Sequence, residues 1–112
     1  MMQEARWTAE VALMHERFPK FAAFKTDSGS VGFFGPVRGR RTGREYTVLV
    51  KVPAQNYPET EPAVYIQPRI APGYWNPNGS LSTCHVRPWR PQINTFASCV
   101  LVAIQFLEDF DR

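Results

Sequence analysis

Glu45-Tyr46-Thr47-Val48-Leu49-Val50-Lys51-Val52 carries the clearest structural signal in the sequence. Tyrosine and valine occupy every second position, and threonine, leucine and lysine stand between them. Because successive side chains of a β-strand point to opposite faces, this alternation predicts a strand with one buried face. The sequence on either side should supply the strands that pair with it.

Two shorter strands are predicted before this stretch and one after it. Residues 21–26 form the first, and Asp27-Ser28-Gly29-Ser30 forms the turn that follows. Residues 31–37 form the second, and its Gly35-Pro36 pair predicts a sheet edge or a bulge. Residues 63–67 form the fourth strand. Because short turns join neighbouring strands, we expect a four-stranded antiparallel meander sheet.

Helices are predicted at both ends of the chain. Between residues 3 and 17, small and apolar residues recur with charged residues between them, which is typical of an amphipathic helix. Asn94 or Thr95 can cap a second helix that runs through residues 96–107. It is apolar on nearly every side up to Phe106, so we expect heavy burial against the sheet. These elements predict an α+β fold.

Composition limits the class of protein. The chain has 112 residues, of which 44% are apolar and 21% charged, as in a globular protein with one core. No apolar run approaches the roughly 18 residues that a membrane span needs, and no leader with charged and then apolar residues opens the chain. We therefore expect one domain over residues 1–112, a soluble cytoplasmic protein and no membrane partner.

The positive charge is concentrated in one short stretch. The net charge is +3, and much of the excess lies in Arg38, Arg40, Arg41 and Arg44. A loop of glycine and arginine can contact phosphates, but a solvated hairpin tip has the same pattern. We favour the hairpin tip and do not expect a nucleic acid as partner.

The two cysteines lie in different environments. Cys99 falls in the apolar helix, where it is most simply a small core residue, whereas Cys84 falls in a polar stretch. Without a secretory signal, both are expected as reduced thiols. Cys84 and His85 are adjacent, and with Cys99 and His15 they do not give the paired spacings of a zinc site. We therefore expect neither a metal nor a cofactor.

The candidate site lies between residues 68 and 89, which show no sustained period. A loop this long inside a compact domain is usually functional. Cys84 would be an accessible thiol there, and such a thiol is a few per cent ionised at neutral pH. Asn76 or Asn78 can donate an amide N–H to a tetrahedral oxyanion, although both also suit turns.

His85 follows the cysteine directly and can lower the pKa of its thiol or act as a general base. On an extended backbone, however, neighbouring side chains point to opposite faces. A direct contact between Cys84 and His85 would thus require the loop to turn there. With Asn76, these two residues are the catalytic candidates.

The chain resembles the ubiquitin-conjugating enzyme family over essentially its whole length. The resemblance rests on the order of elements, on Tyr57-Pro58-x-x-x-Pro62, on the Asn-Gly and Cys of the long stretch, and on Trp89-x-Pro91 before the last helix. It implies a ubiquitin-conjugating-like fold with a long active-site loop. Independently of the resemblance, we interpret five residues as scaffold, because tryptophan packing would hold the loop and a proline would lead into the helix: Tyr57, Pro58, Pro62, Trp89 and Pro91.

Two family landmarks give different registers for the nucleophile. In the family a His-Pro-Asn element places its asparagine eight residues before the active cysteine. Asn76 has that spacing to Cys84, with Tyr74-Trp75 in place of His-Pro. The family's Asn-Gly-x-x-Cys element instead matches Asn78-Gly79, and it then puts Ser82 at the position of the cysteine. A serine would form an oxyester and would need a nearby base, so Cys84 is the better candidate.

We expect no counterpart of the helices that follow the buried helix in eukaryotic members, and this shortened form looks most like the bacterial relatives of the family. Those relatives are associated with activating-enzyme-like and peptidase partners in conjugation and anti-phage operons. The resemblance implies that Cys84 accepts the C-terminus of a ubiquitin-like protein, or of a protein tail, and passes it to an amine of a target protein. An activating-enzyme-like protein is then a possible partner. The alternative is a non-catalytic binding module of the same fold, in which Cys84 is incidental.

Overall fold

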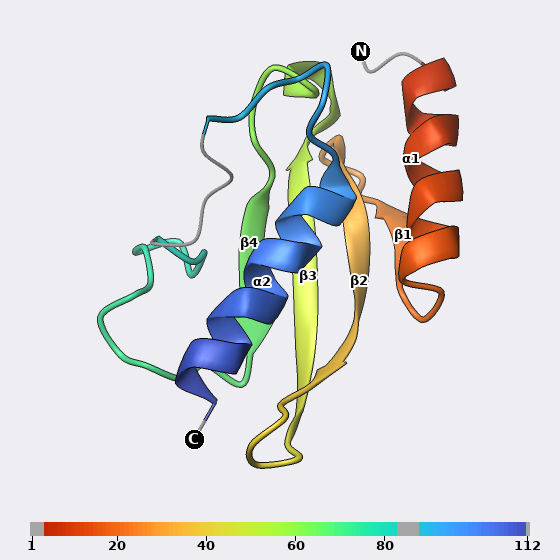
Figure 1. Cartoon of the computed structure of the whole chain (residues 1–112). Helices are drawn as coiled ribbons and strands as arrows, with labels where there is room; N and C mark the ends of the chain where they lie inside the picture. The colour runs from red at the N-terminus through yellow and green to blue at the C-terminus, as the bar shows by residue number, and fades with distance from the viewer. Residues whose placement is uncertain (1–3, 83–87, 112) are drawn as a thin grey trace.

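The computed structural model describes residues 4–82 and 88–111. Its elements follow in the order α1 (Glu4–Arg17), β1 (Ala22–Lys25), β2 (Ser30–Arg38), β3 (Glu45–Pro53), the short 3₁₀ helix η1 (Ala54–Asn56), β4 (Ala63–Gln67) and α2 (Phe96–Phe110) (Figure 1). The predicted α+β class and the order of helices and strands are confirmed.

The four strands form one antiparallel sheet in the order β1-β2-β3-β4. The predicted meander is therefore confirmed. β3 lies at its centre, where Val50 pairs with Phe33 of β2 and with Val64 of β4. These side chains are buried, as are the other alternate residues of β3. The period of two in residues 45–52 thus marks the face that is packed against the helices.

The prediction that Gly35-Pro36 marks an edge strand or a bulge is wrong for β2 as a whole. β2 lies between β1 and β3, and its register with β3 runs without interruption from Ser30 to Arg38. Proline is accommodated because β1 pairs only as far as Phe34 of β2. Pro36 lies two residues beyond that pair, on the side where β1 has ended, so its missing N–H removes no bond of the sheet.

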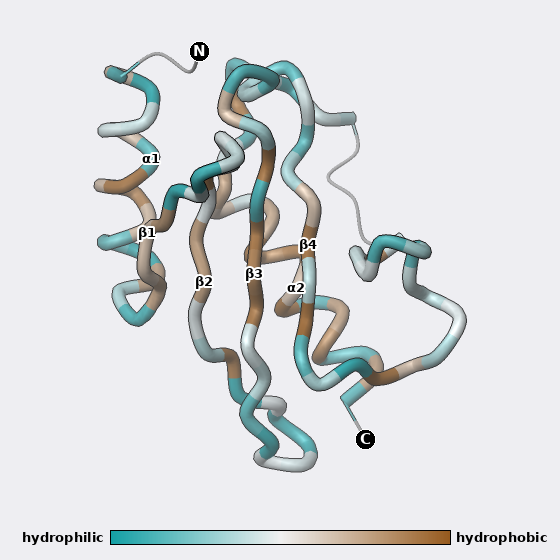
Figure 2. The backbone as a smooth tube through the Cα atoms, turned by 180° about the vertical axis from the view of Figure 1, so that it is seen from behind, coloured by the Kyte–Doolittle hydropathy of each residue, from teal (hydrophilic) through white to brown (hydrophobic). Residues whose placement is uncertain are grey.

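Both helices lie on one side of the sheet. α2 runs across the inner face, and α1 lies toward the β1 edge of the sheet (Figure 1). Trp7 of α1 stacks on Phe33 of β2, with ring centroids 5.2 Å apart. Figure 2 shows the opposite face, which neither described helix covers. That face carries Phe34, whose side chain is 44% exposed. The core therefore occupies a single layer between the helices and the sheet.

The second helix is heavily buried, as predicted, but it ends later than its predicted end at residue 107. Thr95 is the N-cap, since its hydroxyl accepts from the Ser98 N–H while the Ser98 hydroxyl accepts from the Thr95 N–H. The helix continues to Phe110 and includes the acidic residues that were expected to follow it. Leu101 is 52% exposed, so the apolar surface of α2 is not buried on every side. One helix cannot place all of its faces against one sheet.

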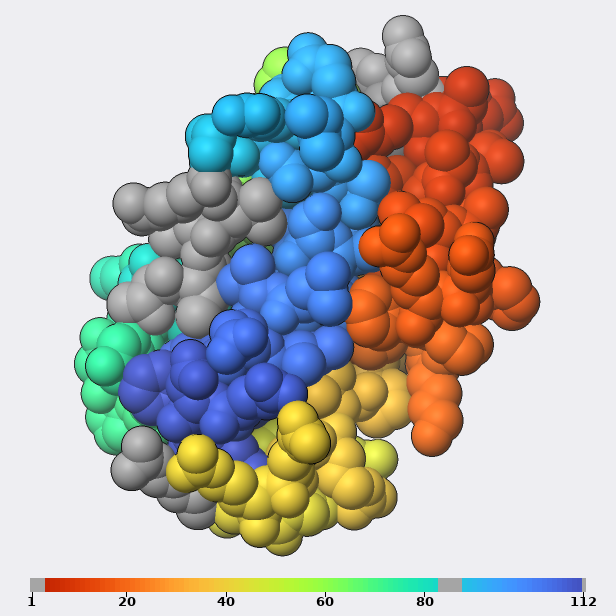
Figure 3. Space-filling view, viewed as in Figure 1, coloured from red at the N-terminus to blue at the C-terminus, as the bar shows by residue number. Residues whose placement is uncertain are grey.

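The hairpin that joins β2 and β3 lies against the C-terminal end of α2 (Figure 3). Asp111 accepts hydrogen bonds from the Thr42 hydroxyl at 2.7 Å, from the Tyr46 hydroxyl at 2.7 Å, and from the Arg41 and Thr42 N–H groups. A Cβ at Gly39 would lie 2.2 Å from the Asp111 carboxylate, so the close approach requires glycine. The arginine-rich stretch is thus a hairpin tip.

Acid should weaken this contact. Hydrogen bonds from Thr42, and then from Tyr46, hold the pKa of Asp111 below its usual value although burial opposes them. The contact therefore stabilises the fold fully above about pH 4, where an unfolded aspartate is ionised, and less as the pH falls through the lower pKa of the folded state. Urea unfolding of Asp111→Asn should show a deficit at neutral pH that shrinks in acid. Asp109→Asn, at an exposed position, is the control. A deficit independent of pH would contradict this account.

Candidate functional site

The stretch expected to be irregular contains a small hairpin. Trp75 and Leu81 form an antiparallel bridge, and the Ser82 N–H donates to the Tyr74 carbonyl at 2.8 Å. The Leu81 N–H donates to the Val64 carbonyl at 2.7 Å, which attaches the hairpin to the outer edge of β4. Leu81 is buried in the core. No helix or strand lies between Gln67 and Phe96 among the described residues, so the predicted irregular structure is confirmed there apart from this single bridge.

Aromatic rings anchor the first arm of the hairpin to the C-terminal half of α2. The ring centroid of Tyr74 lies 4.8 Å from that of Phe110, and the centroid of Trp75 lies 5.8 Å from that of Phe106. The Trp75 indole N–H also donates to the Ile70 carbonyl at 2.9 Å. These contacts fix the position from which the hairpin projects.

Asn76 begins the turn of the hairpin. Its side-chain Nδ2 donates to the Ser80 hydroxyl at 3.0 Å, and its backbone groups bond to Gly79 and Ser80. The Asn78 Oδ1 accepts from the Ser80 N–H and from the Ser80 hydroxyl. The side chains of both asparagines therefore bond to Ser80 within the turn, and Asn76 remains partly exposed. Its predicted role at an oxyanion stays a prediction.

Trp89 is anchored at the other end of the helix. Its indole N–H donates to the Pro58 carbonyl at 2.7 Å, and its ring centroid lies 6.2 Å from that of Tyr57. Tyr57 is buried, with its centroid 4.5 Å from that of Phe96 in the first turn of α2. The scaffold interpretation of Tyr57, Pro58 and Trp89 agrees with these contacts.

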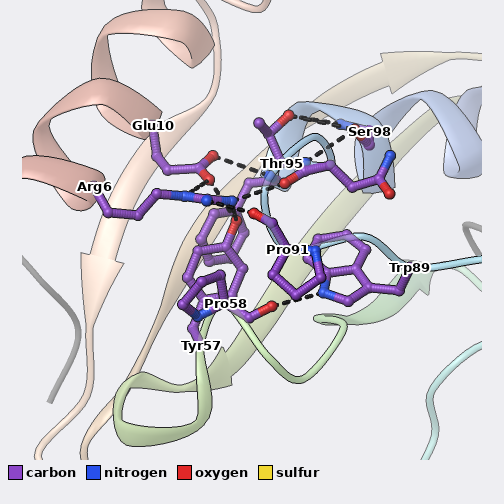
Figure 4. A network of polar contacts seen from close by, with 10 residues as sticks. Arg6, Glu10, Tyr57, Pro58, Trp89, Pro91, Thr95 and Ser98 are labelled. Atoms are coloured by element: carbon purple, nitrogen blue, oxygen red, sulfur yellow. Dashed lines mark hydrogen bonds and ion pairs between the residues drawn. The ribbon is translucent and has the colours of Figure 1, made fainter.

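An ionic cluster, with Glu10 buried and Arg6 partly exposed, ties α1 to the segment that enters α2 (Figure 4). Glu10 is only 2% exposed; it accepts from the Arg6 Nε at 2.9 Å, from the Phe96 N–H at 3.0 Å, and from the Tyr57 hydroxyl. Arg6 also donates to the carbonyl groups of Pro91 and Asn94 at 2.6 and 2.8 Å. We call Arg6, Glu10 and Tyr57 the clasp.

The protonation states of the clasp follow from its burial and contacts. Burial, assisted by the hydrogen bond to Glu10, raises the pKa of the Tyr57 hydroxyl. Burial lowers the pKa of Arg6, but hydrogen bonds and charge interactions with Tyr57 and Glu10 outweigh it, so this pKa lies above its usual value. Tyr57 therefore remains a neutral donor and Arg6 a cation at physiological pH.

Of the clasp, only Tyr57 was predicted from the sequence, as a scaffold residue. Arg6 and Glu10 lie on a helix with several other charged residues, and the sequence does not indicate which of them are buried. Tyr57 lies 47 residues beyond Glu10. Charges at positions i and i+4 occur on many exposed helices. Only the tertiary contact with Phe96 and Tyr57 identifies this pair as buried.

Two of the three catalytic candidates, Cys84 and His85, lie outside the described residues. Asn76 is the described member of the set, and Ser82, the other possible nucleophile, immediately follows the bridge at Leu81. The second cysteine, Cys99, is buried in the core as predicted. Burial, reinforced by the charges of Glu61 and Glu10, raises the pKa of its thiol, so Cys99 is a poor nucleophile.

Residues 4–82 and 88–111 contain no cluster of three or more histidine, cysteine or acidic side chains suited to a metal ion. Neither α1 nor α2 has the length and hydropathy required to cross a membrane. A pocket of about 580 Å³ lies between α1 and the β1–β2 turn, with Trp7 and Lys25 among its lining residues. It contains none of the candidate site residues.

Comparison of the sequence with models of known families and with curated proteins gives no match in either case. The likeness to ubiquitin-conjugating enzymes therefore rests on the motifs and on the order of elements.

Proposed function

We propose that the protein is a ubiquitin-conjugating-like acyl carrier. Cys84 takes the C-terminal carboxyl of a ubiquitin-like protein, or of another protein tail, as a thioester and passes it to an amine of a target protein. A conjugation or anti-phage system of the bacterial kind is the proposed setting, and an activating-enzyme-like protein is a candidate source of the acyl group.

The observation that carries the proposal is the pair of anchors on either side of the cysteine. Ser82, two residues before Cys84, bonds to the hairpin at Tyr74, and Trp89, five residues after it, bonds to Pro58. Asn76, a partly exposed amide donor, belongs to the first anchor. The proposal requires the Asn76 amide to lie close to the acyl group carried by Cys84, where the amide N–H would stabilise the oxyanion of acyl transfer.

The reaction has two steps of the same kind. In the first, the Cys84 thiolate attacks the carbonyl carbon of an incoming thioester, a new C–S bond forms, and the donor thiolate leaves. In the second, the target amine attacks the Cys84 thioester, a C–N bond forms, and the Cys84 thiolate leaves. The surplus proton of the amine passes to a base, for which His85 is the candidate. Asn76 would donate to the oxyanion in both steps.

A synthetic peptide thioester with a Gly-Gly end tests this function without any partner protein. We expect intact mass spectrometry to show the peptide acyl group on the wild-type protein, formed faster than on glutathione, a thiol of ordinary pKa. Added lysine should then release the protein and yield the peptide amide. Both the adduct and the amide should be absent in Cys84→Ala and present in Cys99→Ala.

The same experiment separates the alternatives. An adduct that survives in Cys84→Ala, resists thiol reductants and disappears in Ser82→Ala would move the nucleophile to Ser82 as an oxyester. A wild-type protein that reacts no faster than glutathione and transfers nothing to lysine would overturn the enzyme proposal. The remaining reading would then be the non-catalytic binding module.

Cys99 provides an internal reference for thiol accessibility. Its side chain is buried and its thiol pKa is raised, so alkylation by iodoacetamide at neutral pH should be slow in the folded protein. Cys84 is expected to react much faster, and Cys99 should react only when urea unfolds the chain. Mass spectrometry of tryptic peptides measures both. Equal protection of the two thiols would contradict the proposed role of Cys84.

A further inference from the structure

The side-chain amide of Asn76 has a defined orientation, which follows from a chain of hydrogen bonds. The chain begins at the Ser80 backbone N–H, which lies 3.0 Å from an Asn78 side-chain atom. A backbone N–H can only donate, so this atom must be the amide oxygen, Oδ1, and not the amide nitrogen. Asn78 is thereby fixed without ambiguity.

The next link is the Ser80 hydroxyl, which lies 2.7 Å from the same Asn78 oxygen. A hydroxyl has one hydrogen, and facing an amide oxygen it must use that hydrogen to donate. Only its lone pairs then remain for Asn76, whose side-chain atom lies 3.0 Å away. That atom must be the nitrogen, Nδ2, because an oxygen there would face another acceptor.

Burial makes this arrangement difficult to reverse. Ser80 is only 4% exposed, so a rotated Asn76 amide would place its oxygen against lone pairs that water does not screen. Asn76 itself is partly exposed, and its Nδ2 carries a second hydrogen for which the described residues provide no partner. The amide therefore presents one N–H donor in a constant direction.

The turn does not need these side chains for its closure. The Asn76 N–H donates to the Ser80 carbonyl at 2.7 Å, and the Gly79 N–H donates to the Asn76 carbonyl at 2.9 Å. Gly79 supplies the positive φ, +94°, that the turn requires. Since the backbone already closes the turn, the side-chain chain from Asn78 through Ser80 to Asn76 chiefly sets the direction of the Asn76 amide.

We propose that Ser80 is a positioning residue for acyl transfer, with Asn78 fixing Ser80 and Ser80 fixing the Asn76 amide that donates to the oxyanion. This inference rests on the proposed function and adds to it the residue that orients its oxyanion donor. Ser80 acts only through Asn76, so its contribution must vanish when the Asn76 amide is removed.

A double-mutant cycle tests that dependence, with the peptide thioester as acyl donor and lysine as acceptor. Asn76→Ala should lower kcat about a hundredfold, as loss of an oxyanion donor does elsewhere. Ser80→Ala should lower kcat by about tenfold and leave KM for lysine unchanged. The double variant should be no slower than Asn76→Ala. Ser80→Thr, which keeps the hydroxyl, should restore most of the rate.

Several outcomes would overturn the inference. They are full activity of Ser80→Ala, a rise in KM in place of a fall in kcat, and additive losses in the double variant. Ser28→Ala, at an exposed hydroxyl that pairs with Thr26, is the matched control and should retain full activity. Circular dichroism establishes that each variant is folded.

A spectroscopic measurement separates failure of this inference from failure of the proposed function. In ¹⁵N-labelled protein, Ser80→Ala should shift the Asn76 side-chain amide resonances and speed their exchange with solvent, while Ser80→Thr should leave them near their wild-type positions. Unchanged Asn76 resonances in Ser80→Ala would refute the orienting role even if Cys84 is active. If the resonances respond but no acyl group is transferred, the orienting contact stands and the role in transfer is refuted.

Discussion

Glu10→Ala is expected to lower the free energy of unfolding by about 3 kcal/mol, the lower end of the range for removal of one member of a buried ion pair. Three donors converge on Glu10: the Arg6 guanidinium, the Tyr57 hydroxyl and the Phe96 N–H. Without the carboxylate, Arg6 keeps its bonds to the carbonyl groups of Pro91 and Asn94, but its charge loses its only counterion in the described chain. Urea unfolding followed by circular dichroism measures the change.

Two further substitutions show where the loss originates. Glu16→Ala changes the same residue type at an exposed position of the same helix, so we expect a change within about 0.5 kcal/mol. Glu10→Gln keeps the shape of the side chain and one acceptor oxygen. Its free energy of unfolding should therefore lie between those of Glu10→Ala and Glu16→Ala. Equal stabilities of Glu10→Ala and Glu16→Ala would mean that the clasp contributes nothing to folding.

Phe106→Ala is expected to lower the free energy of unfolding by about 3–5 kcal/mol, the usual effect of deleting a buried phenylalanine ring. Phe106 is only 1% exposed and lies at the centre of the aromatic group that includes Tyr74, Trp75 and Phe110. Because that group holds the first arm of the hairpin, the substitution should also slow transfer from Cys84 if the proposed function holds. Unfolding and transfer are measured on the same preparation, at a temperature where the variant remains folded.

Leu101→Ala is the matched control, since Leu101 lies on the same helix but is 52% exposed. Little apolar surface is lost there, so the change should stay below about 1 kcal/mol. A comparable loss in both variants would indicate that the stability of α2 itself, and not the aromatic anchor, explains the effect.

The order of elements was predictable because it depends on local patterns. Alternation in residues 45–52 and the helical period in residues 3–17 predict these elements well, since one face of each is buried. Pro36 misled the prediction because its tolerance depends on where β1 stops, which is a property of the neighbouring strand. The end of α2 at Phe110 was missed because Glu108 and Asp109 are acidic, and their exposed side of the helix tolerates charge.

The candidate site was less predictable than the fold. Tyr74 and Trp75 are rare residues that attract notice, but their contacts with Phe106 and Phe110 join segments about thirty residues apart, which sequence periodicity does not encode. The sequence does not distinguish Ser80, because a serine after Asn-Gly is common in turns. Its role becomes visible only through the distances to Asn76 and Asn78.

The two anchors of the cysteine-bearing stretch meet the same helix at different points. Phe96, in its first turn, supports Trp89 through Tyr57, whereas Phe106 supports Trp75 directly. Ten residues of α-helix separate them, a rise of about 15 Å. The length of α2 therefore sets the distance between the hairpin and the Trp89 segment. A single residue inserted between Phe96 and Phe106 would rotate one ring about 100° around the helix axis relative to the other. An insertion here should therefore be far more disruptive than a substitution of an exposed residue of α2.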